Sequence, residues 1–160
     1  MHGGVNKAVY AYDVSHYDHW KKILPRGDWQ YGMFGENLTT AGLVDDQVRI
    51  GAVYQLGNVK LQVIQPRFPC FKLNIRFGLA DMLDRFMEEK RNGIYFRVVE
   101  EGYIQVNDEI TLVEPSPYKV TVSDYADCYY TKGSNRLILK QLLSVPVLPQ
   151  RHRTVFEGYI

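Results

Sequence analysis

The chain has 160 residues, of which 46% are hydrophobic and 23% are charged, and its formal net charge is +1. This length fits one domain with a small appendage, and the composition provides enough apolar surface for a core. The charge balance, without a basic stripe, indicates neither a nucleic-acid partner nor an anionic membrane surface. No run of about 18 apolar residues is present, so the sequence predicts no membrane partner.

The two cysteines, Cys70 and Cys128, show neither CxxC spacing nor a Cys/His pattern, which argues against a structural zinc site. The first ten residues include Asn6 and Lys7 and contain no long apolar segment typical of a signal peptide. We therefore predict a cytoplasmic protein with free thiols, and a single disulfide between the two cysteines is the alternative.

The first predicted elements are a strand at 7–12 and a short helix at 16–24, with Ser15 as its N-cap and Pro25 just beyond its end. His16 and His19 are three residues apart in this helix and could share a face that binds a metal. No third ligand candidate lies nearby, which favours two ordinary, partly exposed histidines.

Residues 26–47 are rich in Gly, Asn, Thr and Asp, which predicts a loop with short strands. The polar groups of this segment could form a surface that holds a ligand. The alternative is a turn whose side chains bond their own backbone.

The middle of the chain alternates between strand and helix patterns. Strands are predicted at 48–56, 59–65, 94–99 and 103–113, and a turn at Gly57-Asn58 joins the first two. Between them, Leu79, Leu83, Phe86 and Met87 recur at helical spacing, and Asn92-Gly93 ends that helix. The apolar stripe is typical of core packing.

The character of the sequence changes at Pro115-Ser116-Pro117, the best candidate for a linker. Short helices are predicted at 123–130 and 135–144, and Pro146 and Pro149 break the second pattern. His152 follows among basic and polar neighbours, which is typical of a solvated face. We therefore divide the chain into a β-rich domain at 1–115 and a helical region at 118–160.

Residues 65–73 (QPRFPCFKL) place Cys70 between two prolines and two cations, directly after a strand pattern. The prolines predict a rigid loop. Arg67 and Lys72 favour the thiolate form of a nearby cysteine, which attacks electrophiles and binds soft metals. A cysteine beside Phe68 and Phe71 is more often an inert buried side chain, so composition alone favours the inert interpretation.

Four motifs then follow one another along the chain: His2-Gly3-Gly4 with Lys7-Ala8-Val9-Tyr10, FGENLTTAGL at 34–43, VRIG at 48–51 and QPRFPCFKL at 65–73. In this order and spacing the chain resembles proteins of the MOSC family, named after the C-terminal domain of molybdenum-cofactor sulfurase, and in particular its YiiM branch. The resemblance implies a mainly β fold with helices (α+β), in which a MOSC-type β-barrel is followed by a small helical appendage.

The resemblance also implies a molybdopterin-type molybdenum cofactor, with Cys70 as the metal-binding and catalytic residue. The matching cofactor-binding positions are Arg67, Lys72, Asn37, Thr39, Thr40, Lys7 and His2. Members of this branch are similar to oxidoreductases that reduce N-hydroxylated compounds, such as hydroxylaminopurine bases. A separate flavin or iron–sulfur protein would supply the electrons.

Two alternatives remain beside this enzyme. The chain could be a non-catalytic carrier of the cofactor or of sulfur, or an inactive member of the family. Relatives have further strands before the HGG motif, so we expect an N-terminally truncated chain. Open sheet edges would then make it a homo-oligomer, or it would carry no cofactor.

Overall fold

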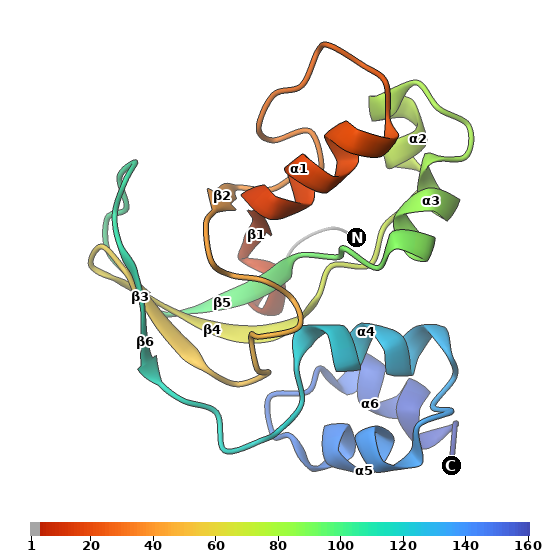
Figure 1. Ribbon diagram of the computed structural model, residues 1–160. Coiled ribbons are helices and arrows are strands. Elements are labelled where there is room, and N and C mark those ends of the chain that lie inside the picture. The colour runs from red at the N-terminus through yellow and green to blue at the C-terminus, as the bar shows by residue number, and fades with distance from the viewer. Residues whose placement is uncertain (1–3) are drawn as a thin grey trace.

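The computed structural model describes residues 4–160, which form one sheet and two groups of helices (Figure 1). The strands are β1 (Val9–Asp13), β2 (Leu38–Thr40), β3 (Val53–Leu56), β4 (Val59–Pro66), β5 (Ile94–Glu100) and β6 (Ile110–Glu114). The helices are the 3-10 helix η1 (Val5–Lys7), α1 (Val14–Ile23), α2 (Lys72–Phe77), α3 (Met82–Glu89), α4 (Val122–Tyr130), α5 (Arg136–Ser144) and α6 (Gln150–Glu157). None of the helices among the described residues is long and apolar enough to cross a membrane.

The six strands form a curled, mixed sheet in the order β2-β1-β5-β4-β3-β6. β1 and β2 are parallel, and the other neighbours are antiparallel. Helices α1, α2 and α3 gather at one end of this sheet, and α4, α5 and α6 pack together at another side (Figure 1). The predicted α+β fold is therefore confirmed, with a half-barrel whose edges within residues 4–160 are β2 and β6.

The predicted hairpin at Gly57-Asn58 is confirmed, but two strands are shorter than predicted. Residues 48–50 leave the sheet and pair with 120–122, where Ile50 N donates to Val120 O at 2.9 Å and Val122 N donates to Val48 O at 2.9 Å. Residues 103–109 form a turn in which Asn107 has a positive φ of 72°, so β6 begins only at Ile110. Pattern alone missed both features because turn geometry and long-range pairing override strand propensity.

The first helix begins two residues earlier than predicted because Asp13, and not Ser15, is its N-cap. One carboxylate oxygen of Asp13 accepts from Ser15 N at 3.0 Å, which satisfies a free N–H of the first turn. The other oxygen accepts from Gly42 N at 2.7 Å and Leu43 N at 3.0 Å. Asp13 therefore also ties the loop after β2 to the start of α1.

The helical region contains the two predicted helices, α4 and α5, and a third, α6, that replaces the predicted solvated face. Phe156 of α6 is fully buried, and Arg153 donates to the carbonyls of Leu143 at 2.6 Å and Val145 at 2.8 Å. His152 packs its ring 5.4 Å from that of Phe68. The solvated interpretation is wrong because these tertiary contacts, and not local hydrophobicity, stabilise α6.

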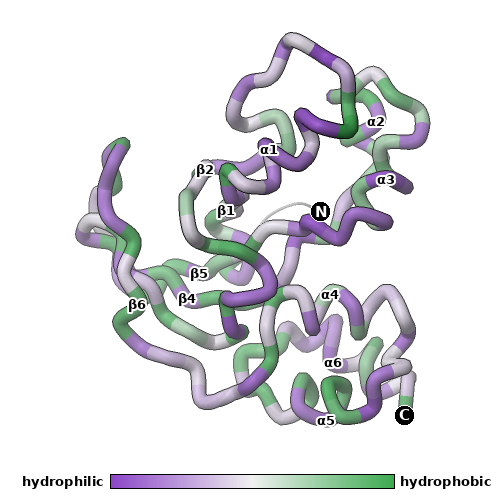
Figure 2. The backbone as a smooth tube through the Cα atoms, viewed as in Figure 1, coloured by the Kyte–Doolittle hydropathy of each residue, from purple (hydrophilic) through white to green (hydrophobic). Residues whose placement is uncertain are grey.

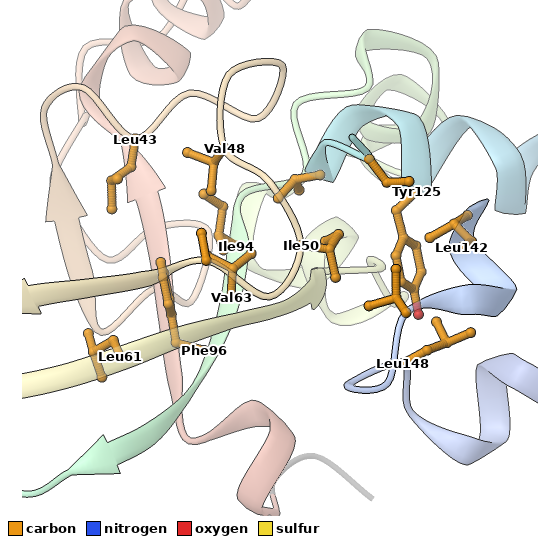
Figure 3. Packing of buried hydrophobic residues seen from close by; sticks show 14 of the residues in the cluster. Leu43, Val48, Ile50, Leu61, Val63, Ile94, Phe96, Tyr125, Leu142 and Leu148 are labelled. Atoms are coloured by element: carbon orange, nitrogen blue, oxygen red, sulfur yellow. The ribbon is translucent and has the colours of Figure 1, made fainter. Parts of the chain in front are cut away.

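Two hydrophobic clusters fill the interior. The sheet core joins β4 and β5 to α4, α5 and α6; ten of its residues are labelled in Figure 3: Leu43, Val48, Ile50, Leu61, Val63, Ile94, Phe96, Tyr125, Leu142 and Leu148. In Figure 2, hydrophobic residues likewise recur along β4, β5 and α5. The aromatic core lies between β1 and the helices α1, α2 and α3; it comprises Tyr10, Tyr12, Tyr17, Trp20, Leu24, Met33, Phe34, Leu73, Phe77, Met82 and Phe86.

Candidate functional site

A pocket of about 660 Å³ lies where the loop after β4 meets α2 and the loop before β2. We call it the Cys70 pocket; it is lined by Tyr10, Gly32, Met33, Phe34, Gly35, Arg67, Phe68, Cys70, Lys72, Leu73, Ile75, Arg76 and Tyr95. Three of the residues singled out in the sequence, Cys70, Arg67 and Lys72, therefore line one pocket. The cation Arg76 was not singled out, and it lies on α2, a helix that the sequence pattern did not reveal.

The segment that carries Cys70 is a loop at 67–71 that is fixed at both ends. At its start, Arg67 N donates to Gly93 O at 3.1 Å, and the Arg67 carbonyl accepts from the Asn92 side chain at 2.9 Å. At its end, the Cys70 carbonyl accepts from Leu73 N at 3.0 Å as α2 begins. The prediction of a loop around Cys70 is confirmed, although 72–73 already belong to α2.

The Phe68 ring anchors the middle of this loop to the helical region. It lies 4.3 Å from the Tyr129 ring and 5.6 Å from the Tyr130 ring of α4, measured between ring centroids. Aromatic pairs at these distances add to the stabilisation that burial alone provides. The helices at the end of the chain therefore help to hold the Cys70 loop in place.

The Arg67 side chain is the best-defined cation of the pocket. Its guanidinium lies 5.5 Å from the ring centroids of both Tyr10 and Phe86, in the range of cation–π contacts. Its Nη1 atom is buried and has no hydrogen-bond partner among the described residues. A buried donor of this kind is costly unless a ligand or water accepts its hydrogen bond.

Glu36 shapes the loop at 32–35 that forms one wall of the pocket. Its side chain is buried, with the residue 9% exposed, and it accepts hydrogen bonds from the Tyr17 hydroxyl, from Gly32 N at 2.8 Å and from Phe34 N at 3.2 Å. Sequence reasoning did not single out Glu36. The signal that could have found it is a carboxylate directly after a Gly-rich turn, where backbone N–H groups need acceptors.

The predicted cofactor residues that follow Glu36 do not line the Cys70 pocket. The Asn37 side chain accepts from Tyr10 N at 2.8 Å, and the Thr39 hydroxyl donates to Glu36 at 3.2 Å. The Thr40 hydroxyl is buried without a hydrogen-bond partner in the part of the chain that the structure describes. Asn37 thus stabilises β1, and Thr39 stabilises Glu36, which shapes the pocket wall, but neither residue lines the cavity.

Lys7 lies beside the pocket rather than in its wall. Its Nζ atom is 5.7 Å from the centroid of the Tyr95 ring, and Tyr95 lines the Cys70 pocket. Lys7 itself lines a smaller neighbouring pocket. His2, the remaining predicted cofactor residue, lies outside the described residues.

Two tyrosines of the pocket have hydroxyls that stay protonated over the physiological range. Burial raises the pKa of Tyr10 well above its usual value and also raises the pKa of Tyr95, in both cases against the opposing charge of Arg67. The Tyr10 hydroxyl donates to the Asn92 carbonyl at 2.9 Å. The Tyr10 hydroxyl is therefore already engaged, and the pocket presents the Tyr95 hydroxyl and several cations beside its thiol.

A buried hydrogen-bond network around Asp45 supports the loop that carries Cys70. Asp45 accepts from His16 Nε2 at 2.9 Å, from Asn92 N at 3.0 Å and from Gly93 N at 2.9 Å. Asn92 in turn holds the Arg67 carbonyl. The expectation of a partly exposed His16 is wrong: the residue is 2% exposed, and its ring bonds to Asp45 from a distant loop. No sequence pattern predicts a contact across 29 positions.

Both cysteines are free, as predicted, but their surroundings differ. Cys70 is partly exposed and lines the pocket, whereas Cys128 is buried in the sheet core. Burial raises the pKa of the Cys128 thiol to about 11. Among residues 4–160, no group of three or more His, Cys, Asp or Glu side chains is arranged to hold a metal ion.

Comparisons with known proteins connect this architecture to a family. Over 155 residues the chain is 36% identical to the uncharacterized protein YflK of Bacillus subtilis (strain 168), a match that covers 97% of this chain and 70% of YflK. Over 120 residues it is 42% identical to a protein named "Reductase" from Gibberella moniliformis. That match covers 73% of this chain but only 21% of the reductase, so most of the latter lies outside the comparison.

Among solved structures, the chain resembles YiiM from Geobacillus stearothermophilus with a TM-score of 0.91 and 34% sequence identity. The superposition covers 98% of this chain and 80% of that one. The sequence model of the MOSC domain matches residues 1–111, a range that includes Cys70 and β1 to β5. The chain therefore belongs to the MOSC domain family and is similar to its YiiM proteins.

Proposed function

We propose that the Cys70 pocket binds a molybdenum-containing pterin cofactor and reduces N-hydroxylated compounds. The observation that carries this proposal is that Cys70, Arg67 and Lys72 line one pocket of about 660 Å³. This volume lies within the usual range of ligand and cofactor pockets. Membership of the MOSC family and a relative named a reductase support the proposal.

The residues of the pocket fit such a group. The Cys70 sulfur is a soft ligand of the kind that binds transition metals as thiolate. The buried Nη1 of Arg67 is a donor without a partner among residues 4–160, and it would be satisfied by a polar edge of the cofactor. Lys72 and Arg76 add charges suited to an anionic substituent.

When bound, the cofactor supplies the two-electron redox chemistry that protein side chains lack. Overall, an N–OH group, two electrons and two protons give an N–H group and water. The chain binds and orients the substrate: Tyr95 and Phe68 offer aromatic surface for a planar base. Because burial keeps the Tyr95 hydroxyl protonated, it is available as a hydrogen-bond donor to the substrate oxygen.

Two kinds of protein partner belong to this proposal. The electrons come from a separate flavin or iron–sulfur reductase, because the two-electron step needs a donor outside this pocket. A second copy of the chain pairs with one of the sheet edges, β2 or β6, which carry unpaired backbone groups within residues 4–160. Light scattering on the purified chain tests this self-association, and a monomer at all concentrations would contradict it.

The experiment for the proposed function uses the full chain expressed in a host that makes molybdenum cofactor. Molybdenum per chain is measured first, and reduction of an N-hydroxylated purine is then measured with an artificial electron donor. We expect Cys70→Ala to lose turnover, while the matched variant Cys128→Ala keeps both metal and turnover. Turnover that survives Cys70→Ala would exclude the proposed role of Cys70. Metal without turnover in the unmodified chain would favour the carrier alternative.

A further inference from the structure

A second pocket of about 220 Å³ lies between η1 and the start of α6. We call it the basic pocket; it is lined by Gly4, Val5, Asn6, Lys7, Gln65, Pro149, Arg151 and His152. It is a neighbour of the Cys70 pocket, because Phe68 lines the Cys70 pocket and packs 5.4 Å from the His152 ring. Its lining residues are nevertheless different, so it is a site of its own.

Positive charge converges on the basic pocket without compensation. Lys7 comes from η1 and Arg151 from α6, and neither takes part in an ion pair among residues 4–160. Both cations, together with burial as the larger cause, lower the pKa of His152 to about 4. The phenols of Tyr125 and Tyr129 of α4 also pack against His152, and burial raises the pKa of Tyr125 well above its usual value.

His152 adds a hydrogen-bond donor to this pocket. His152 Nδ1 is hydrogen-bonded to the Tyr125 hydroxyl. In the neutral ring, when that hydroxyl donates to Nδ1, the proton resides on Nε2, which is then free to donate. Gln65 also lines this pocket and is 2% exposed.

We propose that the basic pocket binds a phosphate group, held by the charges of Lys7 and Arg151 and by a hydrogen bond from His152, with Gln65 beside it in the pocket wall. Charge-assisted hydrogen bonds to phosphate are among the strongest that side chains form. The phosphate is either free inorganic phosphate or the phosphate ester of a larger ligand, since both present the same dianionic oxygens. This site is independent of the reaction proposed for Cys70, and nothing in its chemistry requires a metal.

The test titrates the purified full chain with inorganic phosphate and follows the imidazole signals of His152 by NMR. We expect saturable shifts, and an increase of the His152 pKa by about one unit or more, because an anion nearby favours the imidazolium. His19 of α1, which pairs with Glu89 of α3 and does not line the basic pocket, serves as the internal reference and should not respond. Absence of saturable shifts at millimolar phosphate would overturn the proposal.

Variants then assign the binding to this pocket. We expect Lys7→Met and Arg151→Gln each to weaken phosphate binding by about tenfold or more, as the loss of a charged hydrogen bond predicts. Lys140→Met removes the same charge from the exposed face of α5 and should leave the affinity unchanged. Equal affinities in all three variants would show that phosphate binds elsewhere and would overturn the proposal.

A second ligand distinguishes the two sources of phosphate. Phenyl phosphate carries the same dianion on an aromatic substituent. If it binds more tightly than inorganic phosphate while producing the same His152 shift, the site takes an esterified phosphate. If the two affinities are equal, the site takes the free ion, and both results support a phosphate site. If neither compound shifted the His152 signals, the result would contradict a phosphate site.

Discussion

The two hydrophobic cores are made of different side chains and serve different parts of the molecule. The sheet core is largely aliphatic, and it joins β4 and β5 to the helices α4, α5 and α6. The aromatic core consists mainly of tyrosine, phenylalanine and tryptophan, and it lies behind the Cys70 pocket. Aliphatic side chains can only pack, whereas Tyr and Trp also carry polar groups that bind neighbouring loops.

The polar groups of the aromatic core reach the segments that form the pocket. The Tyr17 hydroxyl donates to Glu36, which shapes the loop at 32–35, and the Tyr10 hydroxyl donates to the Asn92 carbonyl, next to the Cys70 loop. Trp20 Nε1 donates to the Tyr12 hydroxyl at 2.9 Å, and that hydroxyl donates to the Arg91 carbonyl at 3.0 Å. The comparison indicates that the aromatic core both packs and positions the site, while the sheet core holds the fold together.

The strongest test of this difference truncates one side chain in each core. We expect Phe86→Ala to lower the free energy of unfolding by about 3–5 kcal/mol, because it leaves a cavity beside Trp20 and Arg67. Leu142→Ala in the sheet core should cost about 2–5 kcal/mol. Denaturant unfolding measures both values.

What separates the two variants is the pocket. Phe86→Ala removes one of the two rings that flank the Arg67 guanidinium, so it should also weaken ligand binding at the Cys70 pocket under conditions where the chain is folded. Leu142→Ala should leave that affinity unchanged. Equal effects of the two variants on binding would show that the cores do not divide these tasks.

Local pattern predicted the parts of the molecule that depend on neighbouring residues. The hairpin at Gly57-Asn58, the helices α3, α4 and α5, and the loop at Cys70 follow from periodicity, turn residues and prolines. The α+β architecture required more than pattern, since it came from four motifs in family order.

The rest depends on contacts that no local pattern contains. α2 has six residues and buries only Leu73 and Phe77, too few for a periodic signal. α6 is mostly polar and is stabilised through Phe156 and Arg153. The buried pair of His16 and Asp45 joins segments that lie 29 positions apart. Such polar side chains are usually exposed, so the sequence did not indicate that they are buried.

The next largest effect should come from the carboxylate of Glu36. We expect Glu36→Gln to cost about 2–3 kcal/mol, because the buried acceptor of several hydrogen bonds loses its charge. Hydrogen exchange should accelerate at the amides of Gly32 and Phe34, which donate to this side chain. Glu88→Gln makes the same substitution on the exposed face of α3 and serves as the control. Unchanged exchange in the loop at 32–35 would contradict the role assigned to Glu36.

A smaller effect concerns pH and the border between the sheet core and α6. Burial and two nearby cations lower the His152 pKa from 6.5 to about 4, so the unfolded chain binds more protons in this interval. The stabilisation of the folded chain that comes from neutral His152 is fully present above about pH 6.5, and it is lost as the pH falls toward 4. We expect this stabilisation to contribute about 1–2 kcal/mol to the free energy of unfolding, which is less than the full pKa shift implies because part of the ring is exposed.

Thermal unfolding in phosphate-free buffer between pH 4 and 7 measures this dependence. His152→Gln should flatten the pH dependence of the melting temperature in that interval, whereas His19→Gln on α1 should retain it. The two variants together separate the contribution of α6 from that of other titrating groups. An unchanged pH dependence in His152→Gln would show that the ring is not held neutral by its surroundings.

The smallest expected effect concerns the different reactivity of the two cysteines, measured first in the unmodified chain. Cys70 is partly exposed in its pocket, and Cys128 is buried in the sheet core with its pKa raised to about 11. Because the thiolate is the reacting form, a thiol reagent under native conditions should modify Cys70 first, and Cys128 only after unfolding. Mass spectrometry of the labelled peptides measures both rates, and Cys70→Ala should abolish the fast phase. If Cys128 reacted as fast as Cys70 in the folded chain, the sheet core around α4 would have to open far more readily than its packing implies.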